Sequence, residues 1–445
     1  MELLRRLLDK ESARLLKHSS WVLAANSYGT ALAFTRSVLI ARGLGAYLFG
    51  SFSIILSFVG MIQELLNLNL GTALIKFGAA YQAQGRNDKL VALVKICLRV
   101  SVIMLLVCLV VVAALLFFDY GRFIDQPGLG AYIIAYAFAS GMTYFNSISR
   151  SMLRLHYRFR ISSLIEMLMD SVETLAMAWA VWFHPRDLDV FFPTLIVVRF
   201  LNGFICNFIA FAELRAEWQP HVATSESIGS KEIGTIRSFV LANSLGNTLK
   251  TLISQGDVLL LSLLTSPVQV AYYVIAKKTA YAVLTLTDPL TSSIYPQLSK
   301  LMAEGRFDKI RIMLRRITLI AVLPSIVAFA ILLFLNQWLL VSVYGQEYAS
   351  SSESFMYFFT GALLGAVTFW AIPLVQSLGM VRLRIVAYII TILLGSFISY
   401  LAVPDLGARG MAMALLLTNV LNATIFIRFS FLAIHNQEKE ATIDL

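Results

Sequence analysis

Charged side chains stand inside long apolar segments of this chain. One group is mainly basic and comprises Arg36, Arg199, Lys250, Asp257, Lys277 and Lys278. Guanidinium and ammonium groups in apolar surroundings can match the charge of a desolvated anion such as a diphosphate. We therefore interpret this group as a candidate substrate-binding site. The alternative is that each cation pairs with a nearby acid or extends its charged head toward water.

Spacing within the basic group gives further predictions. Lys250 and Asp257 are seven residues apart, which places them almost on one helix face, two turns from each other. Only one of the adjacent Lys277 and Lys278 can face the site directly. Arg36 and Asp257 differ by 257 − 36 = 221 positions, which is close to the offset of the internal repeat described below. We expect this oppositely charged pair to face each other across the repeat axis.

A second group is acidic. Glu166, Asp170 and Glu173 are spaced i, i+4, i+7, which stacks three carboxylates along one face of a helix. Three ionised acids on one stripe repel each other, so at least one should carry a proton or bind a cation. The pattern predicts a proton or sodium site for ion-coupled transport. Salt bridges to Arg36, Arg199 or the basic segment 150–160 are the alternative.

The composition indicates that membrane-spanning helices position these charges. Apolar residues make up 58% of the 445 residues and charged residues 14%, with a mean hydropathy of +0.76. A soluble domain averages about 45–50% apolar and about 25% charged. Uncharged runs near the length of about 20 residues that a membrane-spanning helix needs occur at 126–149, 258–276, 317–346, 354–381 and 385–404. The chain is therefore predicted to be an all-α, polytopic membrane protein.

We expect about twelve spans, at 19–41, 46–66, 91–117, 129–152, 162–183, 190–212, 236–263, 268–290, 314–335, 355–377, 384–402 and 407–433. Alternate connecting segments carry about 25 lysines and arginines on one side and about 4 on the other. Because positive charge marks the cytoplasmic side, both termini are predicted to be cytoplasmic. The same alternation argues against a nucleic-acid surface as the reason for the net charge of +10. Cys97, Cys108 and Cys206 lie in apolar runs and predict neither a disulfide framework nor a metal site.

An internal repeat relates the two halves of the chain. Gly85-Arg86-Asn-Asp88-Lys89 recurs as Gly305-Arg306-Phe-Asp308-Lys309, an offset of 305 − 85 = 220. Six spans within one repeat return each helix to its original orientation, which makes the repeat parallel. We therefore expect two pseudo-symmetric six-helix lobes around a central cavity.

The expected segments are an interfacial amphipathic helix (1–18), an N-terminal lobe (19–212), a cytoplasmic linker (213–235), a C-terminal lobe (236–434) and a cytoplasmic tail (435–445). The first segment alternates leucines with basic residues, which is typical of a helix lying on the membrane surface.

Several motifs resemble a known family. Ala41 to Phe52 (ARGLGAYLFGSF), Leu70 to Phe77 (LGTALIKF), Gln255 to Leu261 (QGDVLLL), Ala271 to Ala276 (AYYVIA) and Tyr295 to Lys300 (YPQLSK) resemble bacterial polysaccharide-biosynthesis flippases. These form the O-antigen, or Wzx-type, branch of the multidrug/oligosaccharidyl-lipid/polysaccharide exporter superfamily.

The resemblance implies a flippase in the bacterial cell inner membrane that moves undecaprenyl-diphosphate-linked oligosaccharide from the cytoplasmic to the periplasmic leaflet by alternating access. It also implies a polymerase and a chain-length regulator as partners, a proton or sodium as coupling ion, and no cofactor or nucleic acid.

Two other functions compete with this interpretation. A multidrug exporter of the same superfamily would use acids such as those at 166–173 to bind cationic drugs. A polyprenyl-dependent glycosyltransferase or polymerase could use Asp187 and Asp189 as a metal-binding D-x-D pair. However, the outer loops, of about 18 residues at most, leave no room for a catalytic domain, and no P-loop, His-Glu-x-x-His or Gly-x-Ser-x-Gly pattern occurs.

The predicted orientation can be tested by cysteine accessibility. Single cysteines replacing Arg86, Arg154 or Arg306 should be shielded from a membrane-impermeant thiol reagent in intact cells, because those loops are predicted to be cytoplasmic. Cysteines replacing Arg122, Asp187 or Glu347 should react. Labelling of the Arg306 position from outside would contradict the predicted topology.

Overall fold

The computed structural model describes residues 10–117, 129–222, 228–282, 284 and 288–443, and regular structure within these ranges is helical. The chain forms two compact units, and α2 and α9 each contribute to both. Unit 1 comprises residues 1–44 and 55–251, and unit 2 comprises 45–54 and 252–445. The boundary within α9 therefore falls between Thr251 and Leu252.

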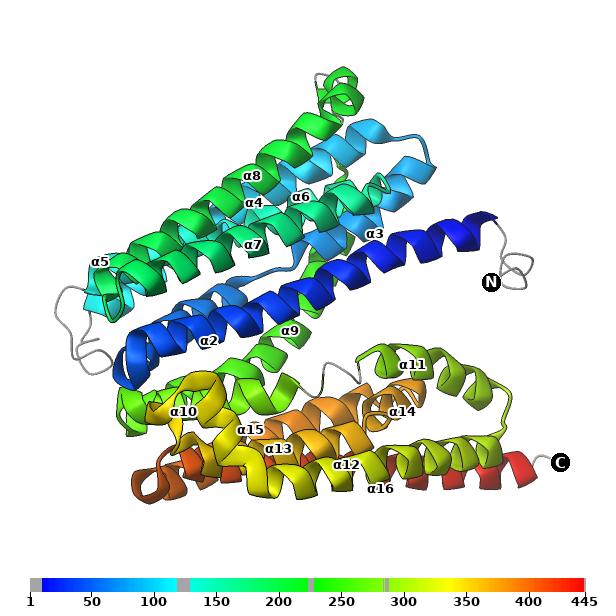
Figure 1. Ribbon diagram of the computed structural model, residues 1–445. Coiled ribbons are helices and arrows are strands. Elements are labelled where there is room, and N and C mark those ends of the chain that lie inside the picture. Colours follow the sequence, from blue (N-terminus) through cyan, green and yellow to red (C-terminus); the bar gives the residue numbers. More distant parts are fainter. Residues whose placement is uncertain (1–9, 118–128, 223–227, 283, 285–287, 444–445) are drawn as a thin grey trace. The chain divides into compact units, whose positions relative to one another are not determined.

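Unit 1 contains most of the helices from α2 to α9 (Figure 1). They are α2 (Lys10–Leu66), α3 (Leu70–Ala83), α4 (Asn87–Phe117), α5 (Leu129–Gly141), α6 (Thr143–Leu155), α7 (Phe159–Phe183), α8 (Leu188–Val222) and the first part of α9 (Ser230–Leu264). Helix α2 covers two expected spans, and Gly45 between them has a positive φ of 76°. This non-helical residue allows the chain to turn between the two spans.

Unit 2 contains the remaining helices (Figure 1). They are α10 (Pro267–Tyr281), α11 (Asp288–Ala303), α12 (Phe307–Tyr344), the short η3 (Gln346–Tyr348), α13 (Ser351–Val367), α14 (Ala371–Ser377), α15 (Val381–Leu406) and α16 (Ala408–Ile443). Helix α13 contacts α10, α12 and α16, and α15 packs along α16.

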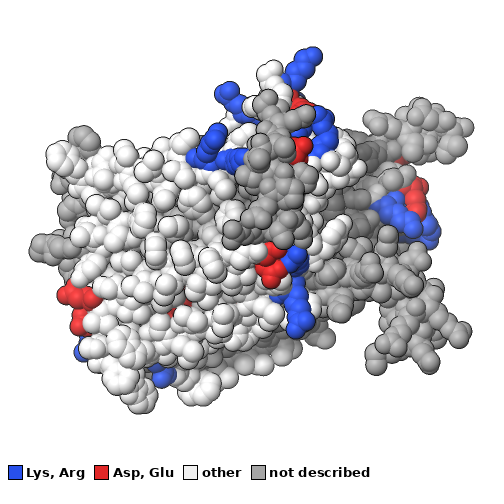
Figure 2. Space-filling model, turned by 90° about the horizontal axis from the view of Figure 1, so that it is seen from above, with Lys and Arg blue, Asp and Glu red and all other residues white. Residues whose placement is uncertain are grey.

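The helices have the length and composition of a polytopic membrane protein. Among the described residues, six helical segments are long and apolar enough to cross a membrane, and the α13–α14 pair, bent by 45°, would make a seventh. Eleven of the twelve expected spans coincide with helices, several of them interrupted or carrying charge, as in α5–α6 and α7. The remaining span, 268–290, begins with α10 and runs into residues outside the described part. In Figure 2 the visible described surface is largely uncharged. The predicted all-α membrane class is confirmed.

Two helices lie where the sequence suggested only connecting segments. α3 and α11 each precede a glycine turn and a long helix, and each packs on neighbours in its own unit. Leu90 and Ile310, which are 220 positions apart, are buried at equivalent places in the first turns of α4 and α12. The amphipathic packing of α3 and α11 is stabilised by tertiary contacts that a search for long apolar runs does not detect.

The repeat is visible in the backbone as well as in the sequence. Gly85 and Gly305 have φ angles of 69° and 66°. The N–H of Arg86 donates to the carbonyl of Tyr81, and the N–H of Arg306 donates to the carbonyl of Leu301. This is the hydrogen-bond pattern of a Schellman helix ending, in which glycine is favoured at the left-handed position.

A second pair of turns follows the same pattern. Tyr157 and Gly379 have φ angles of 58° and 70° and differ by 379 − 157 = 222 positions. Arg158 donates to Leu153, and Met380 donates to Val375. The two halves therefore repeat their helix endings at nearly one offset.

The predicted linker, 213–235, is helical over much of its length. α8 continues to Val222 and α9 begins at Ser230, while 223–227 lie outside the described residues. Lys89 on α4 donates to both carboxylate oxygens of Glu232 at 2.9 and 2.8 Å, which lowers the pKa of Glu232. This contact attaches the start of α9 to unit 1. The lobe boundaries 19–212 and 236–434 remain predictions, as does the surface helix at 1–18, whose first nine residues lie outside the described part.

The glycine turns give a matched test of the repeat. Gly85→Ala and Gly305→Ala should each destabilise the purified protein by about 1–2 kcal/mol, because a side chain disfavours the left-handed conformation. Gly234→Ala, in α9 with open space around it, is the control and should be neutral or stabilising. Thermal unfolding in detergent measures all three. Unchanged unfolding midpoints for both turn variants would contradict the assignment.

Candidate functional site

The main charged cluster of unit 1 is centred on Glu173 of α7. Its side chain is 3% exposed, and its Oε1 atom lies 2.9 Å from Nη2 of Arg199 on α8 and 3.3 Å from Nε of Arg36 on α2. The side chain of Arg199 is 31% exposed and that of Arg36 is 13% exposed. One carboxylate oxygen therefore joins three helices through two charge-assisted contacts.

Both arginines retain unused hydrogen-bond donors. Nη1 of Arg36 and Nε of Arg199 are buried, and neither has a hydrogen-bond partner among the described residues. Buried donors without a partner are rare and call for an explanation such as a water, ion or ligand. Two guanidinium groups against one carboxylate also leave the three side chains with one excess positive charge.

Asp170 lies one turn before Glu173 on the same helix and is half-buried. Its Oδ2 atom is so close to α2 that a Cβ atom added at Gly29 would lie 2.7 Å away. Nearby, the hydroxyl groups of Tyr28 and Ser171 are 2.8 Å apart. Gly29 therefore allows α2 to approach the carboxylate closely. No ion pair of Asp170 is found in the described part of the chain.

The third acid of the stripe has separate partners. Oε1 of Glu166 lies 3.2 Å from Nη1 of Arg150 and 3.5 Å from Nη2 of Arg154, both on α6. Two of the three acids thus form salt bridges. This was the alternative to an ion-coupling site for the stripe, and it accounts for Glu166 and Glu173 but not for Asp170.

Unit 2 has its own buried cluster, centred on Asp257 of α9. Its Oδ2 atom accepts hydrogen bonds from the Tyr273 hydroxyl and from Nζ of Lys277, the latter at 2.5 Å. Its Oδ1 atom accepts the N–H of Val258 at 2.8 Å. Tyr273 and Lys277 lie four residues apart on α10, so both reach the same carboxylate. One acid and one lysine leave this cluster without net charge.

Comparisons with known proteins agree with the motifs. The family model for polysaccharide biosynthesis proteins matches residues 15–302, about two thirds of the chain. The chain belongs to this family. No curated protein sequence matches it significantly.

Solved structures show the fold of this polysaccharide biosynthesis protein. It is similar to an inward-facing multidrug resistance MATE family transporter of the MOP superfamily, with a TM-score of 0.74, 14% identity, and coverage of 92% of this chain and 96% of that one. It is also similar to the lipid II flippase MurJ, with a TM-score of 0.69, 10% identity, and coverage of 94% and 90%. For a MATE transporter of Vibrio cholerae the TM-score is 0.61 and the identity 12%, with coverage of 96% of this chain and 97% of that one. The family resemblance is confirmed by the family model, and the solved structures show that the chain shares the fold of MATE transporters and of MurJ.

The predicted basic group of this polysaccharide biosynthesis protein is divided between the two units. Arg36 and Arg199 share Glu173 in unit 1, whereas Asp257 and Lys277 pair in unit 2. Lys278 is exposed. Lys250 belongs to α9, but its side chain lies outside the described residues. The expected pairing of Arg36 with Asp257 remains a prediction.

Tyr273 is a site residue that charge-based analysis missed. Tyrosine occurs widely in membrane helices, so its type alone carries little information. The detectable signal is its spacing, since it lies four residues before Lys277 on one helix face. Its hydroxyl completes the hydrogen bonding of Asp257.

Proposed function

We propose that the protein is a flippase that translocates undecaprenyl-diphosphate-linked oligosaccharide from the cytoplasmic to the periplasmic leaflet of a bacterial inner membrane. Translocation occurs by alternating access and supplies surface polysaccharide assembly. The chain carries out transport rather than catalysis, and a polymerase and a chain-length regulator act with it. The observation that carries this proposal is the pair of half-buried arginines on Glu173, each with one buried N–H donor that has no partner among the described residues.

The chemistry of the arginine cluster fits a diphosphate. Unaided passage through hydrocarbon would strip water from a charged head group and from many hydroxyls, at several kcal/mol for each unsatisfied polar group. Nη1 of Arg36 and Nε of Arg199 offer N–H donors in a low-dielectric setting. Guanidinium groups match phosphate oxygens in both charge and geometry. The excess positive charge beside Glu173 therefore favours an anionic head group.

Asp170 is the candidate for ion coupling, by a proton or sodium. When Asp170 is ionised, the two acids and two arginines of the cluster sum to zero charge. When it binds a proton or sodium, the sum is +1, which favours an anionic substrate. Ion binding at Asp170 and substrate binding at the arginines are then linked through one shared charge balance. The similarity to MurJ, a lipid II flippase, supports a lipid-linked substrate.

A multidrug cation antiporter is the second candidate. It is favoured by the half-buried Asp170 carboxylate, which has no ion pair in the described residues and could hold a cationic drug, and by the similarity to a multidrug transporter. The excess positive charge at Arg36 and Arg199 opposes a cationic substrate. Export of a cationic dye by vesicles, in the absence of lipid-linked oligosaccharide transport, would favour this candidate.

Replacement of Arg36 tests the main proposal. Arg36→Ala should reduce complementation of a flippase-deficient strain by about tenfold or more, because charge-assisted hydrogen bonds contribute about 1.5–3 kcal/mol each. Arg36→Lys should restore part of the activity, since lysine keeps the charge but loses the planar fork. The measurements are surface polysaccharide and accumulated lipid-linked oligosaccharide.

The matched control is Lys300→Ala, which removes a positive charge from a side chain that is 77% exposed. It should complement as the parent does. Protein abundance in the membrane is measured for every variant. Full complementation by Arg36→Ala at low expression would show that this arginine is structural and that the substrate site lies elsewhere.

Replacement of Asp170 tests the coupling. Asp170→Asn cannot exchange a proton or balance a sodium ion, so flipping in reconstituted vesicles should lose its dependence on an imposed ion gradient. The parent should respond to either a proton or a sodium gradient. Glu166→Gln, whose salt bridges lie on the α6 side, is the control and should keep that response. An unchanged gradient dependence in Asp170→Asn would exclude Asp170 as the coupling residue.

A further inference from the structure

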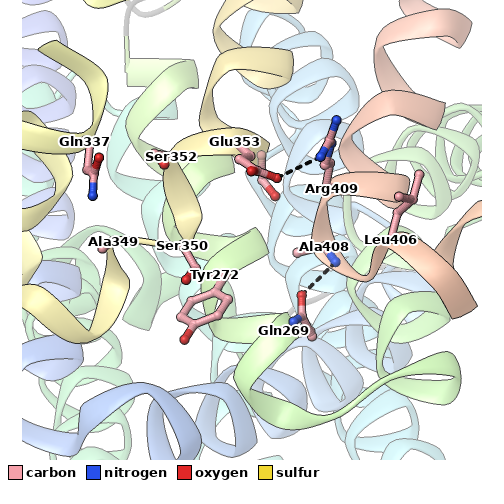
Figure 3. Close-up of a pocket in the computed structure, with 11 residues that line it drawn as sticks. Gln269, Tyr272, Gln337, Ala349, Ser350, Ser352, Glu353, Leu406, Ala408 and Arg409 are labelled. Carbon is pink, nitrogen blue, oxygen red and sulfur yellow. Dashed lines mark hydrogen bonds and ion pairs between the residues drawn. The ribbon is translucent and has the colours of Figure 1, made fainter. Parts of the chain in front are cut away.

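Unit 2 contains a pocket that the charged clusters do not use. It has a volume of about 470 Å³ and lies where the first turns of α10 and α13, the end of α12 and the α15–α16 turn meet (Figure 3). Small-molecule sites typically measure about 300–1,000 Å³. Polar side chains from four helices (α10, α12, α13 and α16) and from the η3–α13 connection line it, among them Tyr272, Gln337, Ser350, Ser352, Glu353 and Arg409.

Contacts among the surrounding residues stabilise the walls of the pocket. Oε1 of Gln269 accepts the N–H of Ala408 at 3.0 Å, which ties α10 to the α15–α16 turn. Gly407 in that turn has a φ of 55° and lies directly against Gln269. Tyr348 is buried and contacts the ring of Tyr272 edge-on, with centroids 6.4 Å apart. These contacts fix the backbone and one aromatic wall before any ligand binds, which lowers the entropy cost of binding.

The hydrogen-bonding groups favour a neutral, hydroxyl-rich ligand. Glu353 and Arg409 form an ion pair at 3.1 Å, and their side chains are 63% and 46% exposed, so both remain accessible to a ligand (Figure 3). Together with the amide of Gln337 and the serine hydroxyls, they present donors and acceptors with no net charge. A sugar hydroxyl both donates and accepts. A phosphate, in contrast, would be repelled by Glu353 and would have to compete with it for Arg409.

We propose that this pocket is a saccharide-binding site that holds part of the oligosaccharide. The loops that form it, around 265–267, 345–350 and 404–408, are those that the charge distribution assigns to the periplasmic side. The pocket therefore receives sugar on the side to which the substrate is delivered. The identity of the sugar source rests on the proposed function, whereas saccharide binding itself is measurable without translocation.

The test uses the full-length protein in nanodiscs. The probe is the repeating-unit oligosaccharide released by mild acid from the surface polysaccharide of the source strain, and binding is measured by calorimetry. Gln337→Leu should weaken binding by about five- to tenfold through loss of its hydrogen bonds. Ser352→Leu, which fills the pocket, should abolish it. Asn336→Leu, the neighbouring amide on α12 that does not line the pocket, should bind as the parent does.

Two results would overturn the proposal: no saccharide binding by the parent protein, or equal binding by the parent, Gln337→Leu and Ser352→Leu. Preference of this pocket for inorganic pyrophosphate over the saccharide would overturn the ligand class. Gln337 is exposed, so loss of folding is not expected, and gel filtration checks this.

Arg36→Ala distinguishes failure of the pocket proposal from failure of the proposed flippase function. If it abolishes flipping while pocket variants bind and flip normally, the flippase function stands and the pocket proposal fails. If the pocket binds saccharide but nothing is flipped, the pocket stands and the flippase function fails.

Discussion

The neutralisation of charge in an apolar interior is the constraint on which the site of unit 1 depends. Oε1 of Glu173 meets guanidinium groups from two other helices, so α2, α7 and α8 are held in one register by a single atom. Removal of one partner from a buried pair leaves an uncompensated charge, which typically costs about 3–5 kcal/mol. Close approach at Gly29 and the Tyr28–Ser171 hydrogen bond reinforce the same helix arrangement. The same register buries one N–H group of each arginine that has no hydrogen-bond partner among the described residues.

Unit 2 satisfies the same constraint with different chemistry. Asp257 receives a lysine, a tyrosine hydroxyl and a backbone N–H, which use both of its oxygens. From the sequence repeat, Arg36 and Asp257 are predicted to occupy equivalent positions with opposite charge. Both units share one carboxylate among several donors, but in unit 1 two of the arginine N–H groups have no hydrogen-bond partner among the described residues. The three side chains around Glu173 therefore carry one excess positive charge, whereas Asp257 and Lys277 balance each other.

The helices and the repeated turns could be predicted from sequence because they depend on local information. Apolar runs of spanning length predict helices, and Gly85 and Gly305 mark equivalent endings. The i, i+4, i+7 spacing correctly placed three acids on one face of α7. Their partners could not be predicted, since pairing depends on how helices rotate against each other. Arg36 and Glu173 are separated by 137 positions, and no local pattern connects them. The pocket of unit 2 was missed for a similar reason, because its polar residues come from helix ends and connecting segments that are distant in sequence.

The paired turns at Tyr157 and Gly379 show that the two halves share a backbone conformation even where their residues differ. Both residues adopt the left-handed conformation and close the same hydrogen-bond ring, yet tyrosine is strained there by about 1–2 kcal/mol relative to glycine. If the halves arose by duplication of a shorter ancestor, this turn has kept its left-handed backbone conformation in both halves, although only one half has the glycine that favours it. The surrounding helices impose the turn on Tyr157, so the architecture is inherited more faithfully than the sequence that encodes it. In the same way, the chain shares its fold with proteins of solved structure at only 10–14% identity.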